Sequence, residues 1–87
     1  MSYFVYVLEC SNKALYTGIT TDLKRRFKQH QEGKGGHYTS YNRPIRICYF
    51  EAHPNRSSAS KREAQIKRWS RTDKLALIKA AKGLLKV

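Results

Sequence analysis

The stretch from residue 3 to residue 10 constrains the fold most strongly. It reads Tyr-Phe-Val-Tyr-Val-Leu-Glu-Cys, a nearly unbroken β-branched and aromatic run that ends at the polar pair Ser11-Asn12. Such a run is typical of a β-strand that is covered on both faces. Because side chains alternate along a strand, we expect one set on each face: Phe4, Tyr6 and Leu8 on the first, and Tyr3, Val5 and Val7 on the second.

Composition predicts one small domain, residues 1–87, with a single core. Of the 87 residues, 40% are hydrophobic, which is enough for one core but not for two. No run approaches the roughly 18 apolar residues of a membrane span, and the N-terminus lacks a signal-peptide pattern. Cys10 and Cys48 do not have the spacing of a zinc knuckle or a redox motif. We therefore expect a cytoplasmic protein with two reduced, partly buried thiols and no membrane partner.

The charge balance points to a polyanionic partner. Eighteen Lys and Arg residues against 6 Asp and Glu give a net charge of +12, which opposes a compact state by self-repulsion. Nucleic acid is the simplest partner. Loop tyrosines either stack on bases or simply pack, and the basic side chains form a phosphate-attracting surface. The residues concerned are Tyr38 and Tyr41, and Lys34, Lys61, Arg62, Lys67, Arg68 and Arg71.

Two further strands are expected. The polar turn Ser11-Asn12-Lys13 is short enough to join the first strand to a second over 14–19 in an antiparallel hairpin. Gly18, near the end of that strand, suggests a close approach of the backbone to a neighbour. Residues 45–50 resemble a third strand, with Glu51 at its end and a turn over 52–55.

Helical spacing follows in three places. Thr20, Thr21 and Asp22 are N-cap candidates for a helix over 23–30 that ends near Gly33. Serines offer caps for a second helix, and Thr72 or Asp73 caps a third that closes at Gly83. The serines are Ser57, Ser58 and Ser60, and the apolar face of the second helix carries Ala59, Ile66 and Trp69.

Two polar residues share the apolar face of the first helix. Leu23, Arg26, Phe27 and His30 are spaced i, i+3, i+4 and i+7, within one arc of about 100°. Arg26 must either extend outward to water or meet an anion. His30 is either a satisfied histidine at the core edge or a proton carrier. Together they favour a site that faces a phosphate.

Three other residues have both a structural and a chemical interpretation. Tyr6 and Tyr16 are ordinary strand residues, unless the hairpin register puts their hydroxyls together on one face. Glu63 completes a capping box if the helix begins at Ser60. If the helix begins earlier, Glu63 is a carboxylate among cations, able to hold a Mg²⁺ or Mn²⁺ ion whose other ligands are waters and a substrate phosphate.

These residues occur in an order that resembles the GIY-YIG nuclease superfamily, most closely its small stand-alone bacterial members, over about residues 3–80. Phe4-Val5-Tyr6 stands where the family has Gly-Ile-Tyr, and Tyr16-Thr17-Gly18 stands where it has Tyr-Ile-Gly. The helix over 22–30 follows, and the segment 59–63 resembles the family's glutamate helix. Phe4 and Thr17 depart from the motif, and the further site asparagine of some members has no counterpart.

The resemblance implies an α/β fold in which a three-stranded antiparallel sheet is flanked by about three main helices. It also implies phosphodiester hydrolysis with one divalent cation, Mg²⁺ or Mn²⁺. By position, Tyr6 corresponds to the tyrosine that activates water, Tyr16 to the second site tyrosine and Arg26 to the arginine that stabilises phosphate charge. His30 corresponds to the auxiliary proton-handling residue and Glu63 to the metal ligand.

Three function hypotheses follow. The first is a DNA endonuclease of repair or recombination that selects its substrate by shape or through a partner protein. The second is a non-catalytic basic module that binds nucleic acid, and the third is an interaction subunit of a repair assembly. The choice between DNA and RNA, and between branched, single-stranded and plain substrates, stays open at this point.

Overall fold

The computed structural model describes residues 2–35 and 41–85, and the side chains of that part up to residue 81. Strand β1 (Tyr3–Cys10) lies at the centre of a three-stranded sheet with the order β2-β1-β3. Strand β2 (Leu15–Thr20) and strand β3 (Pro44–His53) both pair with it antiparallel. The expected α/β fold with a three-stranded antiparallel sheet is therefore confirmed.

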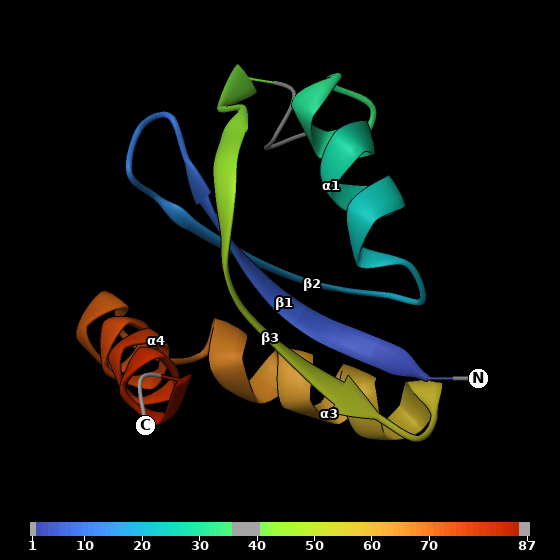
Figure 1. The fold of residues 1–87 in the computed structure, drawn as a ribbon, viewed down its shortest axis with the longest axis vertical. Helices are drawn as coiled ribbons and strands as arrows, with labels where there is room; N and C mark the ends of the chain where they lie inside the picture. The colour runs from blue at the N-terminus through green and yellow to red at the C-terminus, as the bar shows by residue number, and fades with distance from the viewer. Residues whose placement is uncertain (1, 36–40, 86–87) are drawn as a thin grey trace.

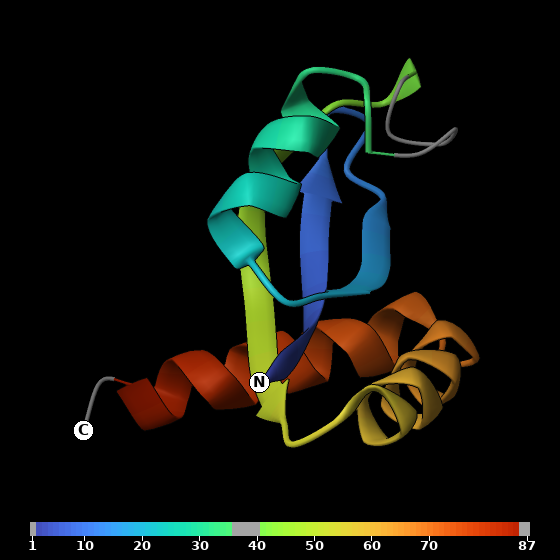
Figure 2. The same ribbon diagram turned by 90° about the vertical axis from the view of Figure 1, so that its right-hand side faces the viewer.

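The helices cover both faces of the sheet, as the composition of β1 predicts. Helix α1 (Leu23–Gln31) lies on one side of the strands, and helices α3 (Arg56–Lys67) and α4 (Arg71–Leu85) lie on the other (Figures 1 and 2). On the α3 and α4 side, Val5 and Val7 pack into a core with Ala59, Ile66 and Ile78. On the α1 side, Tyr6 and Leu8 are almost completely buried.

The hairpin register places the two tyrosines on one face. Tyr6 lies opposite Gly18, and Leu8 lies opposite Tyr16, so Tyr6 and Tyr16 are diagonal neighbours across β1 and β2. The side of β1 that faces α1 therefore carries both rings. The predicted boundaries of β1 agree with the structure, and β2 is shifted by one residue from its predicted range.

Helix α1 presents the face that its spacing predicts. Asp22 is its N-cap, with the side chain accepting the backbone N–H of Arg25 at 3.1 Å. His30 is buried, and Leu23, Arg26 and Phe27 are half-buried. The chain leaves the helix at Gly33, whose φ of +79° lies in the left-handed region that favours glycine.

Three boundary predictions are wrong, for one shared reason. Strand β3 continues to His53, so Glu51 lies inside a strand and residues 52 and 53 are not a turn. Helix α3 is capped by Asn55, whose side chain accepts the N–H of Ser58 at 2.9 Å, and not by a serine. Helix α4 begins at Arg71, where Ser70 Oγ accepts the N–H of Asp73, and it continues past Gly83. In each case the predicted residue is a good local cap or turn former, but the element begins or ends at another residue a few positions away.

The start of α3 also decides between the two interpretations of Glu63. Because the helix begins at Arg56, Glu63 lies in its second turn, too far from the N-terminus to form a capping box. On the helix surface it lies between Ala59 and Ile66, which are both buried against the sheet. The capping-box interpretation is wrong.

Gly18 makes room for the Tyr6 ring, which explains a glycine inside a strand. A Cβ atom at residue 18 would lie 2.5 Å from the Tyr6 hydroxyl oxygen and 2.7 Å from Cζ. Since Tyr6 is only 2% exposed, its ring has no free space to enter. The close approach expected at this glycine is confirmed.

We expect Gly18→Ala to lower the free energy of unfolding by roughly 1–3 kcal/mol, because the methyl group overpacks a buried ring. Urea denaturation measures the loss. In a Tyr6→Leu background, which lacks the hydroxyl and Cζ, the same substitution should cost less. An equal cost in both backgrounds would contradict the contact.

Candidate active site

The centre of the site is a buried contact between β1 and α1. The Tyr6 hydroxyl oxygen lies 2.9 Å from Nε2 of His30, although the two residues are 24 positions apart. His30 has no exposed surface, and Tyr6 has almost none. Sequence spacing placed each of them on an inward face, and the structure shows that these two faces are directed at each other.

Burial keeps His30 neutral. Loss of solvent, followed by repulsion from the Arg26 guanidinium, lowers the pKa of His30 from 6.5 to about 4. With its proton on Nδ1, the neutral ring has a lone pair on Nε2 that accepts the Tyr6 hydroxyl. His30 is therefore a satisfied buried histidine whose Nε2 lies against the hydroxyl of a candidate catalytic residue.

Tyr6 is a phenol rather than a phenolate at neutral pH. Burial raises its pKa, and the nearby Tyr16 and Glu63 act in the same direction, while a hydrogen bond and the positive charge of Arg26 oppose them. Tyr6 therefore retains its proton until another group accepts it. His30 Nε2 is in position to do so.

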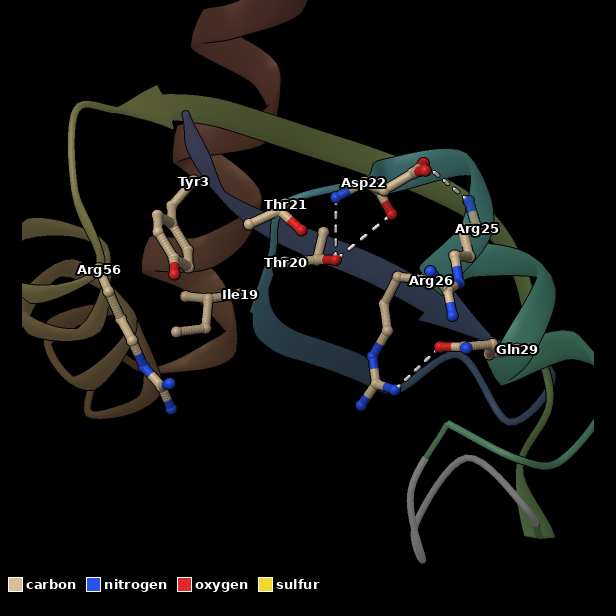
Figure 3. A pocket seen from close by; sticks show the side chains of 9 residues that line it. All are labelled: Tyr3, Ile19, Thr20, Thr21, Asp22, Arg25, Arg26, Gln29 and Arg56. Carbon is tan, nitrogen blue, oxygen red and sulfur yellow. Dashed lines mark hydrogen bonds between the residues drawn. The ribbon is translucent and has the colours of Figure 1, made fainter. Parts of the chain in front are cut away.

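Arg26 is fixed by two contacts beside this pair. Its guanidinium donates to the backbone oxygen of Gly35 at 2.6 Å. It also donates to Oε1 of Gln29 at 3.2 Å (Figure 3). Gly35 also lies directly against the imidazole of His30, where a Cβ atom would overlap Nδ1 and Cγ. The segment after α1 therefore holds in place Arg26 and His30, the two polar residues on the predicted apolar face of that helix.

Tyr16 completes a group of three rings. Its ring centroid lies 6.5 Å from that of Tyr6 and 5.1 Å from that of His30, in tilted and edge-on arrangements. Edge contacts of this kind stabilise aromatic pairs beyond the area they bury. Unlike Tyr6, Tyr16 is only half-buried, so its side of the ring group opens toward solvent.

Glu63 is the only carboxylate among the predicted site residues. Its side chain is 23% exposed, and Oε2 lies 3.3 Å from Nζ of Lys67 one turn further along α3. It lies close enough to Tyr6 to raise the pKa of that phenol. Across residues 2–35 and 41–81, no three His, Cys, Asp or Glu side chains converge as a metal cluster. One carboxylate fits an ion that takes its other ligands from water and phosphate, as Mg²⁺ does.

The predicted nucleic-acid-binding residues are dispersed. Lys34, Lys61 and Arg68 are exposed, and Tyr41 is 76% exposed. Arg71 donates to the backbone oxygen of Lys13 at 2.6 Å. Tyr38 lies outside the described residues. The exposed residues among them come from the segment after α1, from the segment before β3, from α3 and its C-cap, and from the start of α4.

Arg62 belongs to a polar network that the sequence did not reveal. Its Nε lies 3.2 Å from each carboxylate oxygen of Glu51, and its guanidinium carbon lies 5.1 Å from the centre of the Trp69 ring. Glu51 also accepts the Tyr49 hydroxyl at 2.8 Å and contacts His53 Nε2. Burial opposes ionisation of Glu51, but hydrogen bonds from His53, Tyr49 and Arg62 outweigh it and lower the carboxyl pKa. The network ties β3 to α3.

Comparison with known sequences assigns the family. A family model described as the GIY-YIG catalytic domain matches residues 2–76. The chain belongs to the GIY-YIG family. Its similarity to a UPF0213 protein of Syntrophus aciditrophicus is 48% identity over 77 residues, covering 87% of this chain and 88% of the relative. The UPF0213 protein SA0446 of Staphylococcus aureus strain N315 is 44% identical over 78 residues, covering 90% and 95%.

Two solution NMR structures have a similar fold to this GIY-YIG chain. The UPF0213 protein BH0048 of Bacillus halodurans is 40% identical, with a TM-score of 0.59 over 92% of this chain and 85% of that one. The protein EF2693 of E. faecalis is 33% identical, with a TM-score of 0.64 over 94% of this chain and 88% of that one.

None of the helices in the described part of the chain has the length and apolarity that a membrane span requires.

We expect His30 to make stability depend on pH. Because the folded-state pKa of about 4 lies below the ordinary 6.5, only the unfolded state takes up this proton between those values. The free energy of unfolding should therefore fall by about 1.4 kcal/mol for each pH unit as pH drops through that window. The test is urea denaturation of the wild type and His30→Gln from pH 4 to 8. Parallel pH profiles for the two proteins would contradict the assignment.

We expect Glu51→Gln to lower the free energy of unfolding by roughly 1–3 kcal/mol, because Arg62 and His53 lose a partly buried charged partner. Glu9→Gln is the matched control. Glu9 also pairs with one arginine, Arg46, at 2.7 Å, but that arginine is 56% exposed. The control should cost less than about 1 kcal/mol. Equal losses in thermal denaturation would show that the Glu51 network adds nothing to a surface ion pair.

Proposed function

We propose that this GIY-YIG protein is a metal-dependent endonuclease that hydrolyses phosphodiester bonds in DNA, acting in repair or recombination. The observation that carries the proposal is the buried hydrogen bond between Tyr6 and neutral His30, with the fixed guanidinium of Arg26 beside it. A base, a proton acceptor behind it and a cation for phosphate charge are the groups that phosphodiester hydrolysis requires.

Tyr6 activates the attacking water, and His30 accepts the proton of the Tyr6 hydroxyl. The Tyr6 oxygen takes a proton from the attacking water while its own proton moves to His30 Nε2, and the hydroxide formed attacks phosphorus. The bond from phosphorus to the leaving sugar oxygen breaks, and that oxygen takes a proton from solvent water. The relay removes the need for a free phenolate, which the raised pKa of Tyr6 disfavours. The pair stays overall neutral before the reaction, so burial does not oppose its resting state.

Arg26 stabilises the negative charge on the phosphate. Its contacts with Gly35 and Gln29 fix the guanidinium before substrate arrives, so little reorganisation is needed as negative charge grows on the phosphoryl oxygens. Tyr16, half-buried beside Tyr6, supplies a hydroxyl on the same face of the sheet. We assign it the orientation of the phosphate or of the water.

Glu63 is the residue that would hold the divalent cation, Mg²⁺ or Mn²⁺. When bound, the cation would supply Lewis-acid stabilisation of the phosphate charge. Without it, Glu63 pairs with Lys67 at 3.3 Å. The carboxylate is half-buried but accessible, and the side chain of Lys67 is long enough to swing out to solvent.

The test is cleavage of labelled DNA by the purified protein, with Mg²⁺, Mn²⁺ or EDTA. Single-stranded, duplex, flap and four-way-junction substrates, and an RNA strand, rank the substrate classes. We expect Tyr6→Phe to lower the cleavage rate roughly 10²- to 10⁴-fold, because the relay loses its hydroxyl. Glu63→Gln should abolish metal-dependent cleavage. Both variants should bind DNA in EDTA with little change, because neither side chain is a surface cation.

Lys79→Ala, an exposed lysine on α4, serves as the control for a general change in the protein. Metal-dependent products from the wild type and their loss in Glu63→Gln would support the proposal. Salt-sensitive DNA binding by all variants, with no product from any substrate, would instead favour a non-catalytic binding module or a subunit that needs a partner protein.

A further inference from the structure

A second basic feature lies next to the candidate active site. A pocket of about 450 Å³ extends from the first turn of α1, past the end of β2, to the first residue of α3 (Figure 3). Its lining contains three guanidinium groups from two different helices and one carboxylate. The residues are Tyr3, Ile19, Thr20, Thr21, Asp22, Arg25, Arg26, Gln29 and Arg56.

The charges in this pocket are not balanced within the protein. The one carboxylate, on Asp22, already accepts the backbone N–H that caps α1. Arg26 is held by Gln29 and Gly35. The guanidinium groups of Arg25 and Arg56, in contrast, make no hydrogen bond or ion pair with any part of the chain that the structure describes. The pocket is therefore suited to bind an anion, because the guanidinium groups of Arg25 and Arg56 can both donate hydrogen bonds to it.

The pocket also continues from the candidate active site. Arg26 lines the pocket and lies close enough to Tyr6 to lower the pKa of its phenol, so one guanidinium borders both sites. On the other side, Arg56 and Glu63 are seven residues apart on α3, which is two turns on the same face and about 10.5 Å along the axis.

We propose that Arg25 and Arg56 bind a non-scissile phosphate of the strand that is cut, at a subsite flanking the Tyr6 and His30 centre. Arg25 and Arg56 line the pocket from two different helices and lie on opposite sides of it (Figure 3). Both side chains are exposed, so a bound phosphate would draw the two guanidinium groups toward itself. Tyr3 and Ile19 form the apolar part of the wall and would lie against the sugar, while the Thr21 hydroxyl is exposed at the rim.

This subsite rests on the proposed function for its role, but not for its chemistry. If the chain cuts nucleic acid, the subsite sets which end of the strand lies in the pocket and so orients the substrate. If it only binds nucleic acid, the same two arginines are still a phosphate contact. Their contribution should appear in substrate binding rather than in the chemical step, because neither arginine contacts Tyr6 or His30.

The kinetic test uses substrates with one cleavable linkage, so that the binding register is defined. The dinucleoside phosphate TpT is compared with pTpT and TpTp, which add one terminal phosphate on either side. In the wild type, one of the two added phosphates should raise kcat/KM roughly ten-fold or more, through KM, as expected for charge-assisted hydrogen bonds. In Arg25→Ala/Arg56→Ala, that preference should disappear.

The matched control is Lys24→Ala/Lys28→Ala, which removes the same charge from exposed positions on α1 outside the pocket. It should retain the preference for the added phosphate. A wild type that favours neither pTpT nor TpTp, or a double arginine variant that keeps the preference, would overturn the subsite. A loss of the preference in the lysine control as well would also overturn it, because general charge would then be the cause.

A separate binding measurement keeps the subsite testable if no substrate is cut. Fluorescence anisotropy with a labelled thymidine oligonucleotide in EDTA gives affinity as a function of salt. Loss of the contact with one phosphate should make the salt dependence of log K shallower by about 0.7 for a single strand. If the wild type fails to hydrolyse every substrate but this change appears only in the arginine variant, the nuclease proposal fails and the phosphate site stands. An unchanged slope would reject the site.

Discussion

The burial of β1 on both faces is the constraint on which the rest of the structure depends. One face contributes Val5 and Val7 to the core under α3 and α4, and the other places Tyr6 and Leu8 under α1. A residue in the middle of such a strand has almost no freedom to move. Tyr6 is therefore part of the core and part of the candidate site at once. Its hydroxyl must be paired, because an unpaired buried hydroxyl costs about 1–3 kcal/mol.

His30 satisfies that requirement, and its own burial makes it a suitable partner. A protonated imidazole would have no lone pair for the Tyr6 hydroxyl, so the environment that lowers the pKa of His30 also preserves the contact. Arg26 contributes from the same helix face by repelling a proton on His30. The low pKa of His30 therefore favours both the buried hydrogen bond and the state from which the proposed proton relay starts. Its surroundings are cationic, which suits an anionic substrate.

Local sequence patterns predicted what depends on periodicity, and they missed what depends on contacts between distant segments. The alternation in β1 and the spacing of Leu23, Arg26, Phe27 and His30 identified both faces that meet at the site. They could not show that Tyr6 and His30 are in contact, because 24 residues separate them. Likewise, Glu51 resembled a strand end because its partners, His53 and Arg62, are known only once β3 and α3 are packed together. Arg56 gave no signal, since one arginine at a helix start is ordinary in so basic a chain.

The network around Glu51 explains how so small a chain holds its helices in place. A core of this size leaves α3 anchored mainly by Ala59 and Ile66, two apolar contacts on one helix face. Apolar packing alone tolerates small sliding and rotation, whereas the Nε–H of Arg62, shared between both oxygens of Glu51, adds a directional contact. Glu63 directly follows Arg62 on α3, and Arg56 lies on the same helix. The polar network between β3 and α3 therefore sets the position of Glu63 relative to Tyr6 together with the packing of Ala59 and Ile66 against Val5 and Val7 of β1.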